Sequence, residues 1–169
     1  MSLIIIEGPD GAGKSTLVEQ LSKDFGYRVY RSGGPKTFEM MVQVLDEMEI
    51  LCNKKEIYIC DRSPWFSEIV YATALKRPMA VDEISLLDYW HLPQKVIYCR
   101  LADQNKMLAR MSLAFKAHKP LEHTNAVIEN YKAVCTEYES VMSDAKRAGV
   151  NIFKYDWEVT SLQSLKDWI

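Results

Sequence analysis

Cysteine is sparse and scattered in this chain of 169 residues. The four cysteines, Cys52, Cys60, Cys99 and Cys135, form no Cys-x-x-Cys pair and have no histidine nearby at metal-ligand spacing. Cys60 and Cys99 lie in apolar runs, where a buried and unreactive thiol is the usual state. The pattern argues against a disulfide framework or a zinc module, and it favours a reduced, cytoplasmic setting.

Long apolar runs are also missing. No run approaches the roughly 20 residues that a membrane-spanning helix needs. The opening residues Met1 to Ile6 lack the basic segment and the small-residue cleavage site of a secretory signal peptide. We therefore expect no membrane span, no signal peptide and no membrane partner.

A large net charge of either sign is absent as well. The 21 basic and 23 acidic residues give a formal net charge of −2. This balance does not indicate binding to nucleic acid or to an anionic membrane surface, although it allows a local basic pocket. DNA as a substrate is therefore not indicated by charge, but it stays open. The chain also has no internal repeat and no low-complexity segment.

The composition that remains is that of an ordinary globular domain, with 48% hydrophobic and 26% charged residues. The length suits one domain over residues 1–169 with a substantial core. Five short apolar runs predict β-strands at residues 3–6, 27–30, 57–60, 96–99 and 150–153. Leu3 to Ile6 is apolar at every position, as expected for a strand covered on both faces.

Helical patterns separate most of these runs. Apolar residues recur at steps of three and four over residues 41–51 and 66–74. The clearest pattern predicts one long amphipathic helix from Val127 to Ala145. Thr160 and Gln163 have the spacing of a capping box and predict a last short helix.

Strands that alternate with helices predict an α/β fold in three layers, with a five-stranded parallel sheet flanked by helices and right-handed crossovers. Ligands in such sheets bind beyond the carboxyl ends of the strands. The residues directly after each predicted strand are therefore the candidates for function.

The residues after the first strand, from Gly8 to Thr16, match the phosphate-binding pattern G-x-x-x-x-G-K-[ST] between a strand and a helix. Glycines let the backbone turn its N–H groups towards a phosphate, and the helix N-terminus adds positive potential. Lys14 should reach the β- and γ-phosphates of ATP, and the Ser15 hydroxyl should bind Mg²⁺. The predicted nucleotide-binding residues are Gly8, Asp10, Gly11, Ala12, Gly13, Lys14, Ser15 and Thr16.

This loop and the residues before it read Ile-Ile-Glu-Gly-Pro-Asp-Gly-Ala-Gly-Lys-Ser-Thr over residues 5–16. The stretch resembles the E-G-x-D-G-x-G-K-[ST]-T signature of thymidylate kinases. Deoxynucleoside kinases are close relatives, but they usually lack the aspartate. The resemblance implies a P-loop kinase fold with a lid, and it implies that Asp10 faces the sugar of the acceptor nucleotide. A solvent-facing turn residue is the alternative for Asp10.

A second match follows the third strand, where Asp61-Arg62-Ser63 resembles the D-R-Y/S motif of thymidylate kinases and the E-R-S motif of deoxynucleoside kinases. A carboxylate at that strand end would lie beside the P-loop, where it could hold Mg²⁺ or take a proton from an acceptor hydroxyl. The planar guanidinium of Arg62 could clamp a phosphate and neutralise the charge in transfer. A structural surface pair is the alternative.

Further site residues are predicted on the acceptor side. The segment from Arg31 to Thr37 is similar to the R-E-P-G-G-T segment that follows the same strand in thymidylate kinases, with an ordinary loop as the alternative. Arg31 and Lys36 are candidates to bind an acceptor phosphate. In both families aromatic residues on the helix after the third strand face a nucleobase. This implies substrate roles for Trp65 and Tyr71, with the protein core as the alternative.

The segment after the fourth strand resembles the lid region of these kinases. The resemblance implies a helix that ends near Arg110, which would contact the phosphoryl group in transfer, and then a mobile lid at about residues 112–123. This lid has lysines but no arginine, and lysine supplies charge without bidentate geometry. Residues 154–157, after the fifth strand, lie where these folds pass the adenine of ATP.

One difference from thymidylate kinases concerns the acceptor. Only 47 positions separate Lys14 from Asp61, and thymidylate kinases usually have a longer stretch there. A shorter wall predicts a more open acceptor pocket, suited to a bulkier substrate.

Three functions are compatible with these patterns. The first is a deoxynucleoside monophosphate kinase that moves the γ-phosphoryl of ATP to a small nucleotide. The second is a kinase of a hydroxyl acceptor, either on a nucleoside or on a base or end within DNA, with Asp61 as the general base. The third is a nucleotide-dependent ATPase or switch. The predicted catalytic residues are Lys14, Asp61, Arg62 and Arg110, with Ser15 and Asp61 at the metal. A homodimer is left open.

Overall fold

The computed structural model describes residues 3–32, 37–80, 92, 94–118 and 121–169. Five parallel strands form one sheet in the order β2-β3-β1-β4-β5. The strands are β1 (Leu3–Glu7), β2 (Arg28–Tyr30), β3 (Tyr58–Asp61), β4 (Gln94–Cys99) and β5 (Asn151–Tyr155). The predicted α/β fold with a five-stranded parallel sheet is confirmed. Each strand lies at its predicted place, with ends shifted by one or two residues.

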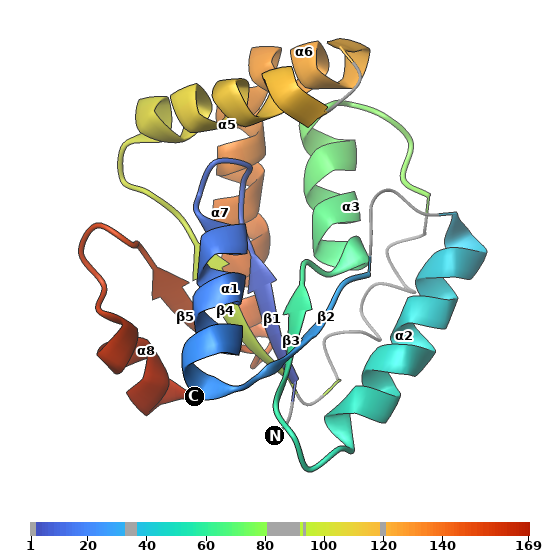
Figure 1. Cartoon of the computed structure of the whole chain (residues 1–169). Helices are drawn as coiled ribbons and strands as arrows, with labels where there is room; N and C mark the ends of the chain where they lie inside the picture. Colours follow the sequence, from blue (N-terminus) through green and yellow to red (C-terminus); the bar gives the residue numbers. More distant parts are fainter. Residues whose placement is uncertain (1–2, 33–36, 81–91, 93, 119–120) are drawn as a thin grey trace.

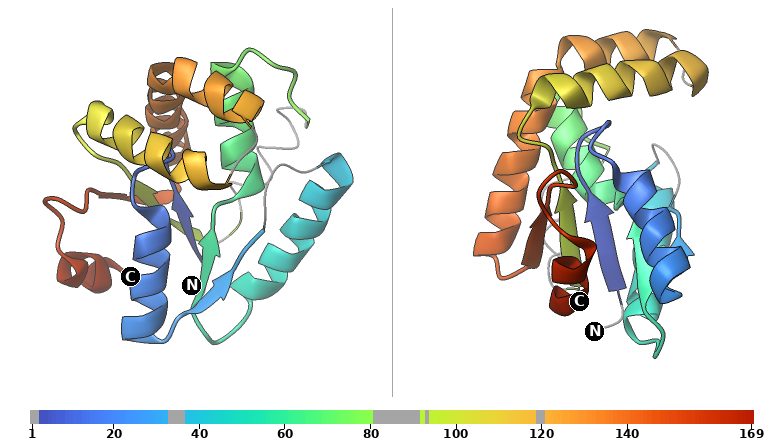
Figure 2. Two further views of the ribbon diagram at one scale, coloured as in Figure 1. Left: turned by 45° about the horizontal axis from the view of Figure 1, so that its top comes forward. Right: turned by 60° about the vertical axis from the view of Figure 1, so that its left-hand side comes forward.

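Helices cover both faces of the sheet, which makes three layers, with α1 and α7 on opposite sides (Figures 1 and 2). The helices are α1 (Lys14–Phe25), α2 (Phe38–Cys52), α3 (Pro64–Ala74), α5 (Gln104–His118), α6 (Leu121–Glu129), α7 (Tyr131–Arg147) and α8 (Leu162–Trp168). β1 is in the middle of the sheet, and all its residues are buried. Its side chains alternate between two core clusters, which is why the strand is apolar without a break.

The two clusters divide the helices. Leu3 and Ile5 belong to a cluster with residues of α2, α3 and much of α7. Ile4 and Ile6 belong to the other, which includes residues of α1, α5 and α8. Among the described residues, no helix is long and apolar enough to cross a membrane. The four cysteines are free thiols. Cys60 and Cys99 are buried, as predicted, and Cys135 is buried as well.

The predicted long helix over residues 127–145 is two helices, α6 and α7, and the prediction of one helix is wrong. Asn130 separates them with φ −104° and ψ 15°, and its amide still donates to the carbonyl oxygen of Ala126. Val127 and Tyr138 are both buried, but in different clusters. The apolar pattern continues through the break because each helix buries a face of its own.

Two further predictions are corrected at helix ends. The last helix is capped by Ser161, whose Oγ accepts from the Ser164 amide at 3.0 Å, and not by Thr160. The predicted lid loop from Ser112 to His123 is largely helical: α5 continues to His118 and α6 begins at Leu121. No glycine or proline lies between Gln104 and His118, so nothing in the chain stops α5 at Arg110.

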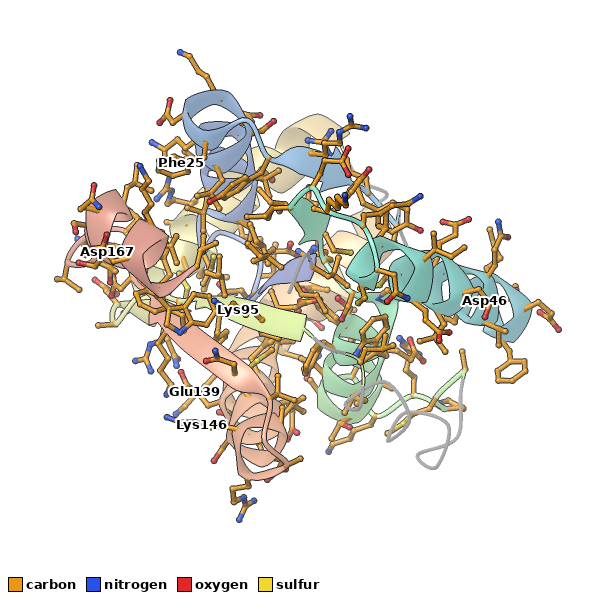
Figure 3. The ribbon with its side chains drawn as sticks, turned by 90° about the horizontal axis from the view of Figure 1, so that it is seen from below. Phe25, Asp46, Lys95, Glu139, Lys146 and Asp167 are labelled. Atoms are coloured by element: carbon orange, nitrogen blue, oxygen red, sulfur yellow. The ribbon has the colours of Figure 1, made fainter. Side chains whose placement is uncertain are left out.

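All five strands run in the same direction, so their carboxyl ends lie together at one end of the molecule. Their carboxyl ends point towards α5 and α6, which cross above the loop that joins β1 to α1 (Figure 1). Seen from below, Lys95 of β4 lies centrally, with Asp46 on α2 and Glu139 on α7 on different sides (Figure 3). Lys95 donates to the carbonyl oxygen of Trp168 at 2.8 Å, which holds α8 to the sheet.

Candidate active site

The loop from Gly8 to Thr16 is folded tightly between β1 and α1. Gly8 has φ +142°, and a Cβ on it would lie 2.1 Å from the carbonyl oxygen of Cys99 in β4. Gly11 has φ +84°, and a Cβ there would lie 2.2 Å from the carbonyl oxygen of Met107 in α5. Only glycine fits these two positions, because any other side chain would meet fixed backbone. The sequence pattern and the backbone geometry therefore agree on a phosphate-binding loop.

Lys14 is the first residue of α1, and it is buried. Its Nζ donates to the carbonyl oxygens of Gly8 and Pro9, at 2.7 and 2.6 Å. Burial, with the positive charge of Arg62 as the second cause, lowers the pKa of Lys14 to about 8. The ammonium group therefore lies inside the curve of the loop, where a phosphate held by the loop amides would meet it.

The loop forms one wall of a pocket of about 790 Å³ at the carboxyl ends of the strands. The residues that line it are Asp10, Gly11, Gly13, Lys14, Ser15, Thr16, Arg31, Asp61, Arg62, Arg110, Met111 and Leu113. Four of these side chains are cationic and two are carboxylates, so the pocket has an excess of two positive charges among the described residues. A chain with a net charge of −2 therefore concentrates positive charge in one cavity. Such a cavity attracts a polyanion.

Asp61 ends β3 and lies next to Ile6 of β1 in the register of the sheet, so its carboxylate is close to the P-loop. Its side chain is 18% exposed, and Oδ2 accepts from Nε of Arg31 at 3.4 Å. Ser15 lines the same pocket. Mg²⁺ usually takes one or two protein oxygen ligands and leaves the other positions to phosphate and water. The oxygens of Ser15 and Asp61 fit that ion.

Asp10 is not a free turn residue. Its carboxylate forms an ion pair with Arg62 and accepts from the Tyr71 hydroxyl at 3.2 Å. Its carbonyl oxygen accepts from the Tyr131 hydroxyl at 2.5 Å. The side chain is 14% exposed and lines the pocket. Tyr71 of α3 and Tyr131 of α7 therefore hold Asp10 in place. The sequence predicts that this aspartate faces the acceptor.

Arg62 has an unusual backbone. Its φ of 71° is in the left-handed region, which non-glycine residues seldom adopt. The conformation turns the chain sharply between β3 and α3, where the Ser63 side chain caps the helix by accepting from the Phe66 amide. Strained backbone of this kind tends to occur at functional sites.

The structure places the other predicted substrate-binding residues differently. Trp65 is fully buried in the core next to Phe66, so the prediction that it contacts substrate is wrong. Trp65 and Phe66 lie in the first turn of α3, directly after the Ser63 cap, and both rings pack into the same core cluster. Tyr71 reaches the site through Asp10, and Arg31 lines the pocket. Lys36 lies outside the described residues.

A second pocket of about 430 Å³ adjoins the P-loop on the other side. Gly13, Arg110, Tyr155 and Trp157 are among the residues that line it, and Arg110 lines both pockets. The guanidinium carbon of Arg110 lies 4.7 Å from the centre of the Trp157 ring, a cation–π contact. Two aromatic residues from the 154–157 segment thus lie beside the loop, where the sequence predicted the nucleobase of ATP.

Three residues at the site were missed from the sequence. Glu7 ends β1 and is fully buried, with hydrogen bonds to Gly8, Ser63 and Tyr138. Tyr131 and Tyr138 reach the site from α7. Glu7 gave two signals: it is an acidic residue at the end of an otherwise apolar strand, and it matches the first residue of the E-G-x-D-G-x-G-K-[ST]-T signature. The two tyrosines gave none, because they fit the apolar face of their helix.

Comparisons with known proteins agree with this architecture. No protein-family model matches the chain. The chain is 28% identical to the SPbeta prophage-derived uncharacterized protein YorR of Bacillus subtilis, over 94% of this chain and 89% of YorR. The crystal structure of YorR in complex with phosphorylated GDP has a TM-score of 0.65 and 23% identity, over 98% of this chain and 92% of that one.

Deoxyadenosine kinase from M. mycoides shows a similar likeness. Its structure with the products dCMP and dCDP has a TM-score of 0.56 and 21% identity, over 98% of this chain and 93% of that one. Its structure with bound dATP has a TM-score of 0.55 and 20% identity, over 98% and 96% of the two chains. At these identities the likeness concerns the fold. The chain has the P-loop α/β fold that nucleoside kinases share, and its likeness to thymidylate kinases in particular stays a prediction.

Proposed function

We propose that this protein is an ATP-dependent kinase that moves the γ-phosphoryl group of ATP to a deoxynucleoside monophosphate, as thymidylate kinases do. One observation carries the proposal. One pocket, with the P-loop as one of its walls, is lined by four cationic residues: Lys14, Arg31, Arg62 and Arg110. A triphosphate and a monophosphate together carry more negative charge than a triphosphate alone. The excess of cationic over acidic residues in the pocket suits two such substrates.

The donor side of the site is built from the P-loop and the second pocket. The loop amides and Lys14 would bind the phosphates. The nucleobase would lie in the pocket lined by Tyr155 and Trp157, which Arg110 joins to the larger one. The γ-phosphate of ATP bound in this way would lie towards Asp61 and Arg62, which line the larger pocket.

The acceptor side lies opposite the loop. Arg31 is 62% exposed and paired only loosely with Asp61, so its guanidinium can turn to a phosphate. Arg62 would contact the phosphoryl group in transfer, and Asp10 with Tyr71 would face the sugar. Ser15 and Asp61 would hold Mg²⁺, which neutralises charge on the phosphoryl oxygens when it is bound. Catalysis then consists of positioning and charge stabilisation, as is usual for phosphoryl transfer.

ADP formation against a panel of acceptors tests the proposal. The panel holds nucleosides, nucleoside monophosphates and DNA oligonucleotides, each with ATP and magnesium. We expect turnover with one or more deoxynucleoside monophosphates, and a loss of about 10³-fold or more in Lys14→Ala with the fold intact by circular dichroism. The surface variant Lys146→Ala, on the far end of α7, is the control. Wild-type turnover in Lys14→Ala would overturn the mechanism.

A hydroxyl acceptor is the second candidate, and the position of Asp61 favours it. The carboxylate is partly exposed in the pocket at the end of β3, where a general base is needed. Deoxyadenosine kinase, whose fold this chain shares, is named for a nucleoside, which is an acceptor of this kind. In this case the base, the sugar or an end within DNA could supply the hydroxyl.

Asp61→Asn separates the two candidates when it is assayed at saturating Mg²⁺, which offsets the loss of a metal ligand. With a hydroxyl acceptor we expect a loss of about 10²-fold or more in kcat, because the base that takes the proton is gone. A phosphate acceptor is already anionic and should lose less. Glu56→Gln is the matched control, since Glu56 forms an exposed pair with Arg28 just before the same strand. ATP hydrolysis that no member of the panel changes would instead favour an ATPase or switch.

A further inference from the structure

One buried carboxylate has no part in the reaction proposed above. Glu7 is fully buried at the end of β1, directly before the P-loop. Its Oε1 accepts from the Ser63 amide at 2.5 Å. Its Oε2 accepts from the Gly8 amide at 3.3 Å and from the Tyr138 hydroxyl at 3.3 Å. The side chain therefore joins three segments of the molecule: the P-loop, the start of α3, and α7.

All three partners of Glu7 are hydrogen-bond donors, and an ionised carboxylate only accepts. A buried carboxylate is costly unless it is paired and hydrogen-bonded. Burial raises the pKa of Glu7, whereas the positive charge of Arg62 and the Ser63 amide are the first causes that lower it. The arrangement of donors fits the charged form, and it would lose a partner if the acid carried a proton.

Tyr138 extends this arrangement to Arg62. Nη1 of Arg62 lies 3.4 Å from the Tyr138 hydroxyl oxygen. A guanidinium can only donate, so the tyrosine oxygen must accept, and its own proton is left for Glu7. The hydrogen bonds therefore run in one direction, from Arg62 through Tyr138 to Glu7. The direction is fixed because only Glu7, at the end of the chain, is an acceptor-only group.

Glu7 also stabilises the backbone next to Arg62. Arg62 has φ 71°, and the next residue, Ser63, donates its amide to Glu7. A left-handed conformation at a non-glycine residue persists only when surrounding contacts maintain it. Glu7 thus acts on Arg62 twice, on its side chain through Tyr138 and on its backbone through Ser63. Asp10 holds the other side of the guanidinium.

We infer that Glu7 and Tyr138 are positioning residues that aim the guanidinium of Arg62 into the phosphate pocket. The inference rests on the proposed phosphotransfer, but it holds for any acceptor. Tyr138 does not line the pocket, and Glu7 does not either. Their effect should therefore be on the rate of transfer and not on the binding of ATP.

Tyr138→Phe tests the inference, because it removes only the hydroxyl and keeps the buried ring. We expect kcat to fall about tenfold, the equivalent of one hydrogen bond to a charged group, with KM for ATP changed by less than about twofold. Radiolabelled ATP allows the same measurement in the slow Arg62→Ala background. There we expect Tyr138→Phe to change kcat by less than about twofold, because the group that it positions is absent.

Tyr98→Phe is the matched control. Tyr98 is also buried and stacks on Tyr138, but its hydroxyl donates to Glu139 at 3.1 Å, whereas Arg62 donates to the Tyr138 hydroxyl. We expect it to lower the melting temperature about as much as Tyr138→Phe and to leave kcat within about twofold of wild type. Glu7→Gln should reduce kcat more than Tyr138→Phe, since its amide NH₂ would face a donor.

Three outcomes overturn the inference: an unchanged kcat in Tyr138→Phe, an equal loss of kcat in Tyr98→Phe, or a full tenfold loss that persists in the Arg62→Ala background. Failure of the proposed function is seen separately. If Lys14→Ala keeps wild-type turnover, the phosphotransfer mechanism itself is wrong, whatever the tyrosine variants do.

Discussion

Three charged side chains at the P-loop, those of Glu7, Lys14 and Arg62, are buried or partly buried, and each has hydrogen-bond partners. Lys14 lies on two loop carbonyl oxygens, and Arg62 is paired with Asp10. Glu7 accepts hydrogen bonds from two backbone amides and a tyrosine. A buried charge is tolerated only with such partners. The residues therefore have fixed orientations before any nucleotide binds, which is what electrostatic catalysis requires.

The pKa of Lys14 makes a pH dependence predictable. Burial, with the charge of Arg62 as a second cause, lowers it from the ordinary 10.5 to about 8. Only the protonated lysine attracts phosphate, so kcat/KM for ATP should fall as pH rises above about 8, by up to about tenfold per unit. kcat should fall less, because a bound triphosphate favours the charged lysine. A pH profile of both constants with the preferred acceptor checks this.

Lys14→Arg is the control for that profile. A guanidinium stays charged throughout the range, so the alkaline fall in kcat/KM should disappear even if the absolute activity is low. A wild-type profile that stays flat to about pH 9.5 would show that Lys14 does not titrate as its burial implies.

At the scale of elements, α5 and the segment after β5 meet over the P-loop. Arg110 of α5 contacts the ring of Trp157, and both line the second pocket. Trp157 is 42% exposed, which is more than is usual for a tryptophan in a folded protein. A nucleobase in this pocket would cover the ring. The contact therefore links two elements that are far apart in sequence into one binding surface.

Trp157→Ala should weaken the binding of ATP without changing the chemistry. A ring that stacks and takes part in a cation–π contact contributes about 1–2 kcal/mol, so KM for ATP should rise about 5- to 30-fold with kcat within about twofold. Val159→Ala, at an exposed position in the same segment, should leave both constants unchanged. An unchanged KM in Trp157→Ala would place the nucleobase elsewhere.

At the scale of the whole molecule, the site exists only where several elements converge. The central strand β1 supplies Glu7 and leads into the P-loop, and β3 beside it supplies Asp61. Helices α3, α5 and α7 contribute Tyr71, Arg110 and Tyr131 to the same end of the sheet. A ligand that bridges these elements binds the folded chain and not the unfolded one.

A non-hydrolysable ATP analogue with magnesium should therefore stabilise the fold. At about 100 times its dissociation constant, it should add about 2.7 kcal/mol, which for a chain of this size raises the melting temperature by about 5–10 °C. Thermal melts with and without the analogue measure this. Lys14→Ala should lose most of the rise. An unchanged melting temperature in the wild type at millimolar analogue would argue against a nucleotide site.

The sequence by itself determined the fold class, and it predicted most of the residues that line the candidate site. The strand and helix periods are local properties of the chain, and they placed all five strands. The glycines, Lys14 and Ser15 lie within one continuous segment, so their pattern is visible without any tertiary contact. Asp61 and Arg62 were found because a motif directly after a buried strand must lie at the edge of the sheet.

The tertiary structure decided what depends on elements distant in sequence. Trp65 looked equally suited to substrate and to core, and only the packing of α3 on the sheet buried it. The break at Asn130 was hidden because both helices continue one apolar pattern. The partnership of Glu7, Tyr138 and Arg62 joins residues up to 131 positions apart. No local pattern reports such contacts, because they form only when the sheet and α7 come together.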